Sequence, residues 1–500
     1  MKKFLLEVIV FVCGALVMVF ELVGARVLGP YVGTSLFVWT SLIGIILGSL
    51  SLGYFLGGKL SDHKPEYAIF GMIILFAGVA ILVTAISKDF ILRNLSHQFF
   101  DIRWLAVLSS MILFAPGSLF LGMVSPFAVK LKIHSLQKSG STVGNLYAIS
   151  TVGSIAGTFA GGFYLIPFFG SSSLVYLIAV LLIFTALAIF VVFKRWAEGL
   201  LAISVLLVAG YFYMRAHTKT RSFVDEDTLY NRVMIYDAED SKSGKQVKFM
   251  RINDERSSAM FLEEDGLVFP YLKYYDLAAH FYPGFKNVLM LGGSGYAYPK
   301  YFLEKYPNRR IDVVEIDQQL TNLARQHFKL KDDPNLTIFH EDARTFFNHN
   351  NRKYDAILTD VFNSQFTLPF QLTTREFVQH QYDALTDSGL VIVNIISSIQ
   401  NRGNLFLLSE AKTFRQVFKR VLFFAVNDPK NGDVIQNIML VALKGDLPAN
   451  GLVSQDSVMN VFLSKKITLD IPENIPVLTD DYAPVEYFVS KMISQYYGAN

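Results

Sequence analysis

The chain has 500 residues, of which 52% are hydrophobic and only 17% are charged. It is too long for one ordinary domain and too apolar for a soluble protein of this size. A formal net charge of +3 without any basic run gives no indication of nucleic acid binding. The single cysteine, Cys13, excludes a disulfide within the chain and a cysteine-based metal site, and we expect no metal. These features predict a membrane protein with a soluble part.

Apolar residues are concentrated before about residue 215. Seven segments there are long enough for a bilayer crossing of about 20 residues, and they cover 4–29, 36–58, 67–87, 105–129, 144–168, 172–193 and 197–214. The first has basic residues before it, like a signal peptide, but it lacks a small-residue cleavage signal and is followed by more spans. We therefore predict a transmembrane helical bundle at 1–215. We expect a linker, a small β-subdomain and a lead-in helix at 216–285, and an α/β domain at 286–500.

Glycines recur at intervals of four residues in the second and fifth apolar segments. Such spacing lets helices approach closely in lipid, and it predicts packing faces at Gly44/Gly48, Gly53/Gly57 and Gly153/Gly157/Gly161.

Glu21 and Arg26 are the strong charges that lie deep in a predicted span. An ionisable residue inside a membrane is a candidate for function, although either group could also reach the interface or pair within the bundle. Glu21 is the better functional candidate, as a substrate contact, because its shorter side chain reaches the interface less easily.

The distribution of charge does not decide on which side of the membrane the carboxy-terminal domain lies. The lysines and arginines next to the spans divide almost evenly between the two sides, with a small excess that places the carboxy-terminal domain outside. If the carboxy-terminal domain binds a cofactor that is made in the cytoplasm, it must lie on the cytoplasmic side of the membrane, and we expect this placement.

The stretch from Lys286 to Asp360 alternates strand and helix patterns. The buried-strand patterns VLMLGG, IDVVEID and YDAILTD each end in a glycine or an acid. Open α/β sheets present ligand-binding groups at this carboxyl edge, so the pattern predicts a site for a nucleotide-type cofactor.

Three positions along this stretch match the needs of an adenosine-containing ligand. Glycines in the run Gly292-Gly293-Ser294-Gly295 allow the backbone to approach a ligand. Glu315, at the end of the next strand, is placed to accept the ribose hydroxyls. Asp342 can accept from the adenine amine, while Ala343 supplies a backbone donor. The alternatives are a structural glycine turn, helix caps or solvated loops.

Acids elsewhere are candidates for the reaction and for the acceptor. Asp360 ends its strand beside the expected reacting centre, where a carboxylate can orient or deprotonate a nucleophile. Asp480 and Asp481 could bind a cationic acceptor. For all three, capping of the segment that follows is the alternative.

Further elements are expected on both sides of this stretch. The segment 231–262 predicts two or three short strands with a turn at 241–245, and a helical pattern leads from it into the core stretch. Beyond Asp360 we predict a helix at 374–386, a strand at 389–397, a helix at 404–420 and an antiparallel hairpin at 421–445.

With these motifs in place, the soluble half resembles the polyamine aminopropyltransferase (spermidine synthase) family, a branch of the class I S-adenosylmethionine methyltransferase-like folds. The whole chain resembles the bacterial membrane-fused members, through LGSLSLGYFLGGKLSD, GNLYAISTVGSIAGTFAGG and LTDDYAPVE. The resemblance implies a β-subdomain, a seven-stranded Rossmann-like sheet and a multi-pass protein of the bacterial cytoplasmic membrane, with a homodimer allowed. The implied cofactor is S-adenosylmethionine or its decarboxylated form, and the implied product is S-adenosylhomocysteine or methylthioadenosine.

Family roles carry over to particular positions. Asn231 lies where the family has a cofactor-contacting glutamine, and Glu315, followed by Ile316, lies at the position of the ribose-binding acid. Asp342 and Ala343 lie at the positions of the adenine-binding pair. Asp360 lies at the position of the catalytic aspartate.

Departures from the family pattern concern the acceptor. The family's GGGDGG reads GGSGYA, so that Gly295 replaces an acid, and DSSD reads Asp360-Val361-Phe362-Asn363. The family's Tyr-His pair reads Phe269-Pro270, and aromatic residues appear at Tyr296, Tyr298 and Phe362. A diamine such as putrescine needs carboxylates to offset desolvation of its ammonium groups. The substrate candidates are Tyr296, Asn363, Asp480, Asp481, Tyr482 and Glu21.

We therefore expect a membrane-bound transferase that moves an aminopropyl or alkyl group to a small-molecule or membrane-presented acceptor other than free putrescine. Two alternatives stay open. The bundle could be a transporter with a sensor or degenerate cofactor domain, although seven spans without repeated halves fit a carrier poorly. The cofactor could also react with itself, which would make the protein a lyase.

Overall fold

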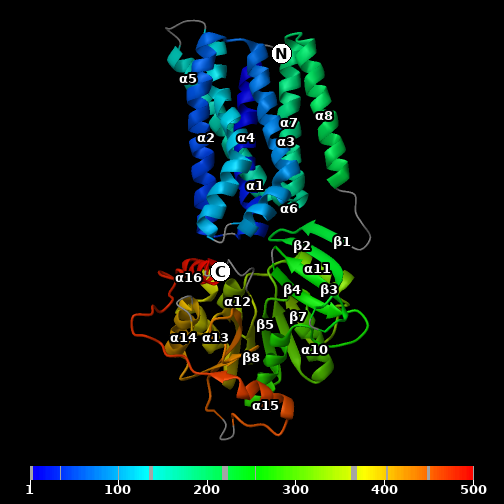
Figure 1. The fold of residues 1–500 in the computed structure, drawn as a ribbon, viewed down its shortest axis with the longest axis vertical. Helices are drawn as coiled ribbons and strands as arrows, with labels where there is room; N and C mark the ends of the chain where they lie inside the picture. Colours follow the sequence, from blue (N-terminus) through cyan, green and yellow to red (C-terminus); the bar gives the residue numbers. More distant parts are fainter. Residues whose placement is uncertain are drawn as a thin grey trace. The chain divides into compact units, whose positions relative to one another are not determined.

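A computed structural model describes residues 4–33, 35–98, 101–133, 139–216, 223–241, 243–253, 255–361, 369–400, 404–447 and 451–498. The chain divides into two compact units, Met1–Thr220 and Arg221–Asn500 (Figure 1). The amino-terminal unit is helical, and the carboxy-terminal unit combines a small antiparallel sheet with a large α/β sheet.

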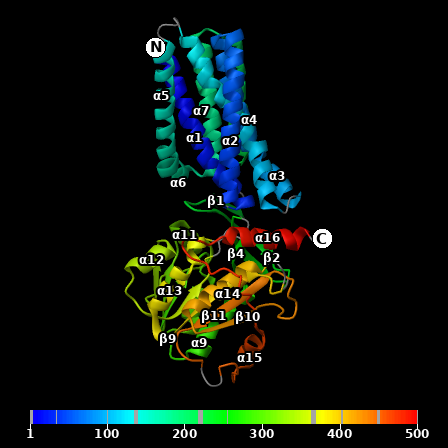
Figure 2. The same ribbon diagram turned by 90° about the vertical axis from the view of Figure 1, so that its left-hand side faces the viewer.

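The amino-terminal unit contains long helices that run side by side (Figure 2). They are α1 (Leu5–Val32), α2 (Leu36–His63), α3 (Tyr67–Gln98), α4 (Ile102–Lys132), α5 (Ser139–Ala160), α7 (Ser171–Val192) and α8 (Trp196–Ala216). A π-helical turn, η3 (Gly161–Leu165), and the short α6 (Ile166–Phe169) follow α5. In the part of the chain that the structure describes, seven helices are long and apolar enough to cross a membrane, which is the predicted number. They are compatible with a multi-pass membrane protein.

Some of the predicted packing glycines lie at close helix contacts. A side chain at Gly53 or Gly57 of α2 would collide with the backbone of α4, and one at Gly153 or Gly157 of α5 would collide with the backbone of α1. Glycine at these positions lets the helix backbones touch, as the spacing predicted.

The prediction was wrong for Gly44 and Gly48. A Cβ atom added at either residue would meet no atom within 4 Å, and both glycines are exposed on α2. Four-residue spacing indicates a shared helix face, but it does not indicate which neighbour covers that face.

The carboxy-terminal unit begins with an antiparallel sheet in the order β1-β2-β3-β4. Its strands are β1 (Phe223–Asp227), β2 (Arg232–Glu239), β3 (Gln246–Ile252) and β4 (Glu255–Phe261). The last three lie in the segment for which two or three strands were predicted, and the β2–β3 turn is at the predicted place. The lead-in segment forms a 3₁₀ helix, η4 (Pro270–Asp276), and the short α9 (Leu277–Phe281).

The large sheet has the strand order β12-β10-β11-β9-β8-β5-β6-β7. The strands are β5 (Asn287–Leu291), β6 (Arg310–Val314), β7 (Leu336–Phe339), β8 (Tyr354–Thr359), β9 (Leu385–Ser397), β10 (Arg420–Ala425), β11 (Gln436–Leu443) and β12 (Lys466–Ile467). Strands β5 to β9 pair in parallel, while β11, β10 and β12 pair antiparallel, so the predicted hairpin is present. The described strands are eight rather than seven, because the two-residue β12 pairs with the edge of β10.

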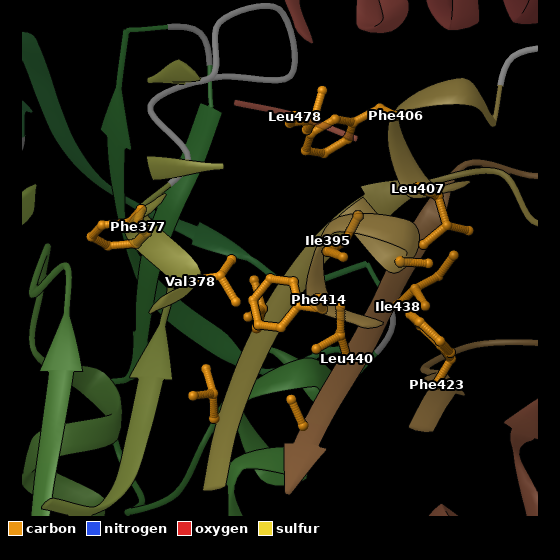
Figure 3. Packing of buried hydrophobic residues seen from close by; sticks show 14 of the residues in the cluster. Phe377, Val378, Ile395, Phe406, Leu407, Phe414, Phe423, Ile438, Leu440 and Leu478 are labelled. Atoms are coloured by element: carbon orange, nitrogen blue, oxygen red, sulfur yellow. The ribbon is translucent and has the colours of Figure 1, made fainter. Parts of the chain in front are cut away.

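Helices cover both faces of this sheet. They are α10 (Ala297–Lys305), α11 (Gln318–His327), α12 (Ala343–His349), α13 (Arg375–Ala384), α14 (Leu405–Val417), α15 (Ser457–Ser464) and α16 (Val485–Gly498), with a 3₁₀ turn, η5 (Phe370–Leu372). Figure 3 shows one core, in which Phe414 of α14 lies between Val378 of α13 and Leu440 of β11. Burying such a side chain contributes about 1.5–3 kcal/mol.

The chain reverses its direction of sheet growth between β5 and β8. After β5 it adds β6 and then β7 on one side, and β8 then pairs on the other side of β5. Loops that leave β5 and β8 therefore diverge, and in open α/β sheets this switch point is where ligands bind. The glycine run follows β5 and Asp360 follows β8.

Candidate active site

A cavity of about 510 Å³ lies at this carboxyl edge, a volume in the usual range for a small-molecule site. Its walls come from the ends of β5, β6, β7 and β8, from η4 and from the small antiparallel sheet. It is lined by most of the predicted cofactor residues and by the predicted catalytic acid: Asn231, Gly292, Gly293, Ser294, Glu315, Ile316, Asp342, Ala343 and Asp360.

The glycine turn after β5 has a tightly constrained backbone. Gly292 has a φ of 89°, and a side chain there would collide with the backbone carbonyl of Asp360. Ser294 and Tyr296 also have positive φ angles, of 46° and 55°. Left-handed backbone at residues other than glycine costs free energy and persists only where the surroundings enforce it.

Glu315 provides that enforcement. One carboxylate oxygen, Oε2, accepts the backbone N–H groups of Gly293 and Ser294, each at 2.9 Å, and Oε1 accepts that of Asp317 at 3.0 Å. Burial raises the pKa of Glu315, while these three donors oppose the shift. Glu315 thus holds the glycine turn in place and also lines the cavity.

Asn231 is joined to the end of β6 through a buried network. Its amide Nδ2 donates to Asp317 Oδ2 at 3.4 Å, and its Oδ1 accepts from Asn253 Nδ2 at 3.0 Å. The hydroxyl of Thr228 also donates to Asp317. Asp317 caps α11 and connects the small sheet to the large one, a role the sequence analysis did not assign.

Asp342 caps α12, the alternative that the sequence left open. Its Oδ1 accepts from the backbone N–H of Arg344 at 2.9 Å and of Thr345 at 3.1 Å. Ala343 is the first residue of α12. Both residues line the cavity. The two cap hydrogen bonds go to Oδ1, so capping orients Asp342 and leaves Oδ2 for a ligand.

Asp360 lies in the wall of the cavity between two side-chain donors. The hydroxyl of Tyr271 donates to Oδ2 at 2.9 Å, and Asn394 Nδ2 donates to Oδ1 at 3.1 Å. Asn437 Nδ2 donates in turn to Asn394 Oδ1 at 2.9 Å. Burial raises the pKa of Asp360, and the side chains of Asn394, Tyr271 and Tyr275 oppose that shift. A carboxylate held in this way has a fixed orientation and can accept a proton from a ligand.

Neither Tyr271 nor Asn394 was predicted from the sequence. Tyr271 lies in η4 and Asn394 in β9, each far from Asp360 along the chain. A polar residue inside the apolar run of β9 was the one available signal, because a buried amide needs a partner.

Two predicted residues of the turn do not line the cavity. Gly295 packs against β4, where a side chain would come within 2.5 Å of Ser258 Oγ. Tyr296 is fully buried, and its hydroxyl is 2.7 Å from that of Thr321. The left-handed backbone at Tyr296 turns its ring into the core, so the prediction of a substrate contact was wrong.

The acids near the carboxyl terminus also lie away from the described cavity walls. Asp480 accepts from Arg344 Nη2 at 2.6 Å and from Thr374 Oγ1 at 2.7 Å, and so it joins α12 to α13. Asp481 and Tyr482 are exposed. The structure therefore places these three predicted acceptor residues elsewhere, and Asp480 is occupied in an ion pair.

Two further predictions are not placed in this cavity. Asn363 and Phe362 lie outside the described residues. Glu21 is half-buried in α1 of the amino-terminal unit. Elsewhere in the described ranges, no group of three His, Cys, Asp or Glu side chains could hold a metal ion.

The part of the cavity beside Asp360 is aromatic and rich in amides. Phe269 and Tyr271 stack with ring centroids 6.1 Å apart, and Tyr298 also lines the wall. The amide side chains that line the cavity are those of Asn231, Gln371, Asn394, Asn427, Gln436 and Asn437, and its walls also include the charged residues Glu255, Arg256 and Glu341.

Part of the chain is similar to a known protein family. The family model described as the spermine/spermidine synthase domain matches residues 274–445. Over these residues the chain is similar to the spermine/spermidine synthase family. Its curated relatives are named as transferases, and it is an enzyme of that class.

Two relatives illustrate how far the similarity extends. A polyamine aminopropyltransferase of Vibrio vulnificus is 25% identical over 225 residues, which cover 43% of this chain and 71% of the relative. Polyamine aminopropyltransferase 1 of Streptomyces coelicolor is 23% identical over 421 residues, covering 78% of this chain and 75% of the relative. The second alignment is longer than the globular unit and therefore includes part of the helical unit. A crystal structure of a probable spermidine synthase from Corynebacterium glutamicum covers 53% of this chain and 97% of its own, with 23% identity and a TM-score of 0.43.

Proposed function

We propose that the protein is a membrane-bound transferase that uses S-adenosylmethionine or its decarboxylated form. It would transfer an aminopropyl or alkyl group to a nucleophile other than free putrescine. The observation that carries this proposal is the single cavity that brings together the glycine turn, Glu315, Asp342 and Asp360.

The residues at the strand ends fit an S-adenosyl compound. Glu315 would accept the ribose hydroxyls with the lone pairs its backbone donors leave free, and Asp342 and Ala343 would bind the adenine. Gly292 leaves room for the ligand against the backbone, and Asn231 and Ile316 complete this side. The bound compound would supply a carbon activated by a sulfonium leaving group.

Asp360 would act on the nucleophile. In its charged form it can accept a proton from the attacking group while Tyr271 and Asn394 keep its two oxygens in place. Most of the rate enhancement would come from holding the nucleophile in line with the activated carbon, because the leaving group needs no further activation.

The acceptor side argues against a small dication. Gly295 takes the place of an acid and is packed against Ser258, and aromatic and amide groups line the wall beside Asp360. These groups suit a larger or less charged nucleophile, presented from solution or from the membrane. The seven apolar helices would anchor the enzyme in the bacterial cytoplasmic membrane, and we place the catalytic domain on the cytoplasmic side, where the cofactor is made.

Calorimetry with the full chain in detergent tests this proposal. We expect S-adenosylmethionine, its decarboxylated form or methylthioadenosine to bind the wild type, and Glu315→Ala to weaken binding by on the order of a hundredfold or more. This variant removes a buried charge-assisted contact and also releases the glycine turn.

Two control variants sharpen that experiment. Asp481→Ala alters an exposed acid away from the cavity and should bind like the wild type. Asp360→Asn should keep cofactor binding, and mass spectrometry should then find no transfer product where the wild type forms one. The absence of binding by all three compounds to the wild type would overturn the proposal.

A further inference from the structure

The segment LTDDYAPVE, residues 478–486, is not among the described walls of the active-site cavity, but it is anchored in the globular unit. Leu478 is fully buried in the core that Figure 3 shows, and its backbone N–H donates to Thr413 Oγ1 at 2.9 Å. Its carbonyl accepts from the backbone N–H of Arg375 at 2.8 Å. The segment is therefore held against the start of α13, and this fixes the position of its first acid, Asp480.

The carboxylate of Asp480 holds a guanidinium group in place. Its Oδ2 accepts from Arg344 Nη2 at 2.6 Å, and its Oδ1 accepts from the hydroxyl of Thr374, the residue that caps α13, at 2.7 Å. The other terminal nitrogen of Arg344, Nη1, donates to Thr374 Oγ1 and to the backbone carbonyl of Gln371, each at 3.1 Å. A planar guanidinium can make these bonds at the same time. It therefore joins α12 to η5, to α13 and to the carboxy-terminal segment.

The backbone of Arg344 holds a residue of the cavity wall. Its N–H donates to Asp342 Oδ1 at 2.9 Å, and both Asp342 and Gln371 line the cavity. Arg344 thus contacts two parts of the wall, Asp342 through its backbone and Gln371 through its side chain. The guanidinium, fixed by Asp480, controls where Asp342 Oδ2 lies relative to η5.

The placement of Asp342 has a chemical consequence in the proposed function, where this acid binds the amine of adenine. A hydrogen bond of this kind needs a donor–acceptor distance of about 2.7–3.2 Å, so a small displacement of the carboxylate loses it. A base with an oxygen in place of the amine would set two acceptors against each other, and a site built for the amine rejects it. The preference for adenine therefore depends on how accurately Asp342 is placed.

We propose that Arg344 and Asp480 are positioning residues that set the preference of the cofactor site for adenine over hypoxanthine. The inference rests on the proposed function, in which Asp342 contacts the adenine. Neither positioning residue lines the described cavity. Arg344 acts through Asp342 and Gln371, and Asp480 acts through Arg344. The carboxy-terminal acid would then serve the cofactor side of the site rather than the acceptor.

Two ligands that differ at one position of the base test the proposal. Methylthioadenosine has an amine on the base where methylthioinosine has an oxygen, and each would be titrated into the full chain in detergent by calorimetry. We expect the wild type to prefer methylthioadenosine roughly ten- to a hundredfold, the range for a hydrogen bond to a charged group. Asp480→Ala should lower this preference by about fivefold or more, because the released guanidinium no longer fixes Asp342.

Two further variants separate positioning from folding. Arg344→Lys keeps a positive charge near Asp480 but cannot reproduce the planar fork that also reaches Gln371, so it should lose the preference too. Arg352→Ala is the matched control, because it breaks an ion pair of similar length, 2.7 Å from Nη1 to Asp312 Oδ2, at the amino end of β8. It should keep the wild-type preference. A residue with only a structural role would weaken both ligands equally and leave their ratio unchanged.

The outcomes distinguish this inference from the proposed function. If the wild type binds neither S-adenosylmethionine, its decarboxylated form nor methylthioadenosine, the proposed function fails and the inference fails with it. If the wild type binds methylthioadenosine but binds methylthioinosine equally well, or if Asp480→Ala and Arg344→Lys keep the full preference, only the positioning roles are overturned.

Discussion

At the scale of single residues, the ability of Asp360 to act as a base depends on the hydrogen bonds that its carboxylate accepts. Its carboxylate receives one donor from η4 and another from β9, two elements that meet only in the folded unit. Burial favours the neutral acid, whereas each donor favours the charged form that can accept a proton. The balance between these effects sets the pH range in which Asp360 can act as a base.

Tyr271→Phe should raise the pKa of Asp360 further, because it removes a donor that stabilises the carboxylate while burial stays the same. Asp360 would then lose its charge at a higher pH as the solution is acidified. The measurement is an infrared titration of the carboxyl group, assigned by its loss in Asp360→Asn, which needs no known acceptor.

Tyr274→Phe is the matched control. It makes the same change in the same helix, but the Tyr274 hydroxyl donates to the backbone carbonyl of Ala425 at 3.2 Å rather than to Asp360. An unchanged titration of Asp360 in Tyr271→Phe, or an equal shift in both variants, would contradict the assignment.

At the scale of elements, the glycine turn after β5 contacts both the large sheet and the small antiparallel sheet. Gly293 and Ser294 donate to Glu315, the residue that follows β6, while Gly295 packs against Ser258 of β4. An acid at position 295 has no room there. A side chain at position 295 therefore requires β4 to move away from the turn.

Gly295→Ala should destabilise the protein by about 1–3 kcal/mol, the usual cost of overpacking a tight contact. Ser258→Gly should recover part of that loss in the double variant, since it removes the two nearest atoms that the new methyl group would meet. Thermal unfolding of the full chain in detergent provides the comparison, with Ser258→Gly alone as the baseline. Wild-type stability in Gly295→Ala would show that the contact imposes no constraint.

At the scale of the whole molecule, a helical unit and an enzyme unit have different packing rules. The enzyme core is held by burial of apolar side chains, as in the cluster around Phe414. The helices lack that driving force if lipid surrounds them, so backbone contact at small residues must bring α1 against α5 and α2 against α4.

Gly153→Ile should destabilise the helical unit by about 1–3 kcal/mol or prevent its assembly, because the new side chain collides with the backbone of α1. Gly48→Ile is the matched control: no atom lies within 4 Å of a Cβ at that position, and an apolar group on an exposed face suits lipid. Thermal stability in detergent, with the yield of monodisperse protein, gives the readout. Equal tolerance of both changes would refute the assigned packing face.

Much of this architecture was predictable from the sequence alone. Apolar runs of about 20 residues define the seven long helices, and buried strand patterns define the parallel strands. Glu315, Asp342 and Asp360 could be assigned to one edge because the carboxyl ends of parallel strands meet there. Each of these inferences uses a period or a position within one short segment.

Only the tertiary structure decided which distant residues meet. It turned Tyr296 into the core, paired Asp480 with Arg344 and brought Tyr271 and Asn394 to Asp360. It also left Oε2 of the buried Glu410, in α14, without a hydrogen-bond partner. Local patterns record whether a side chain is buried, because burial follows the periodicity of the element. Local patterns do not indicate which residues a side chain contacts, because those contacts arise from the packing of separate elements.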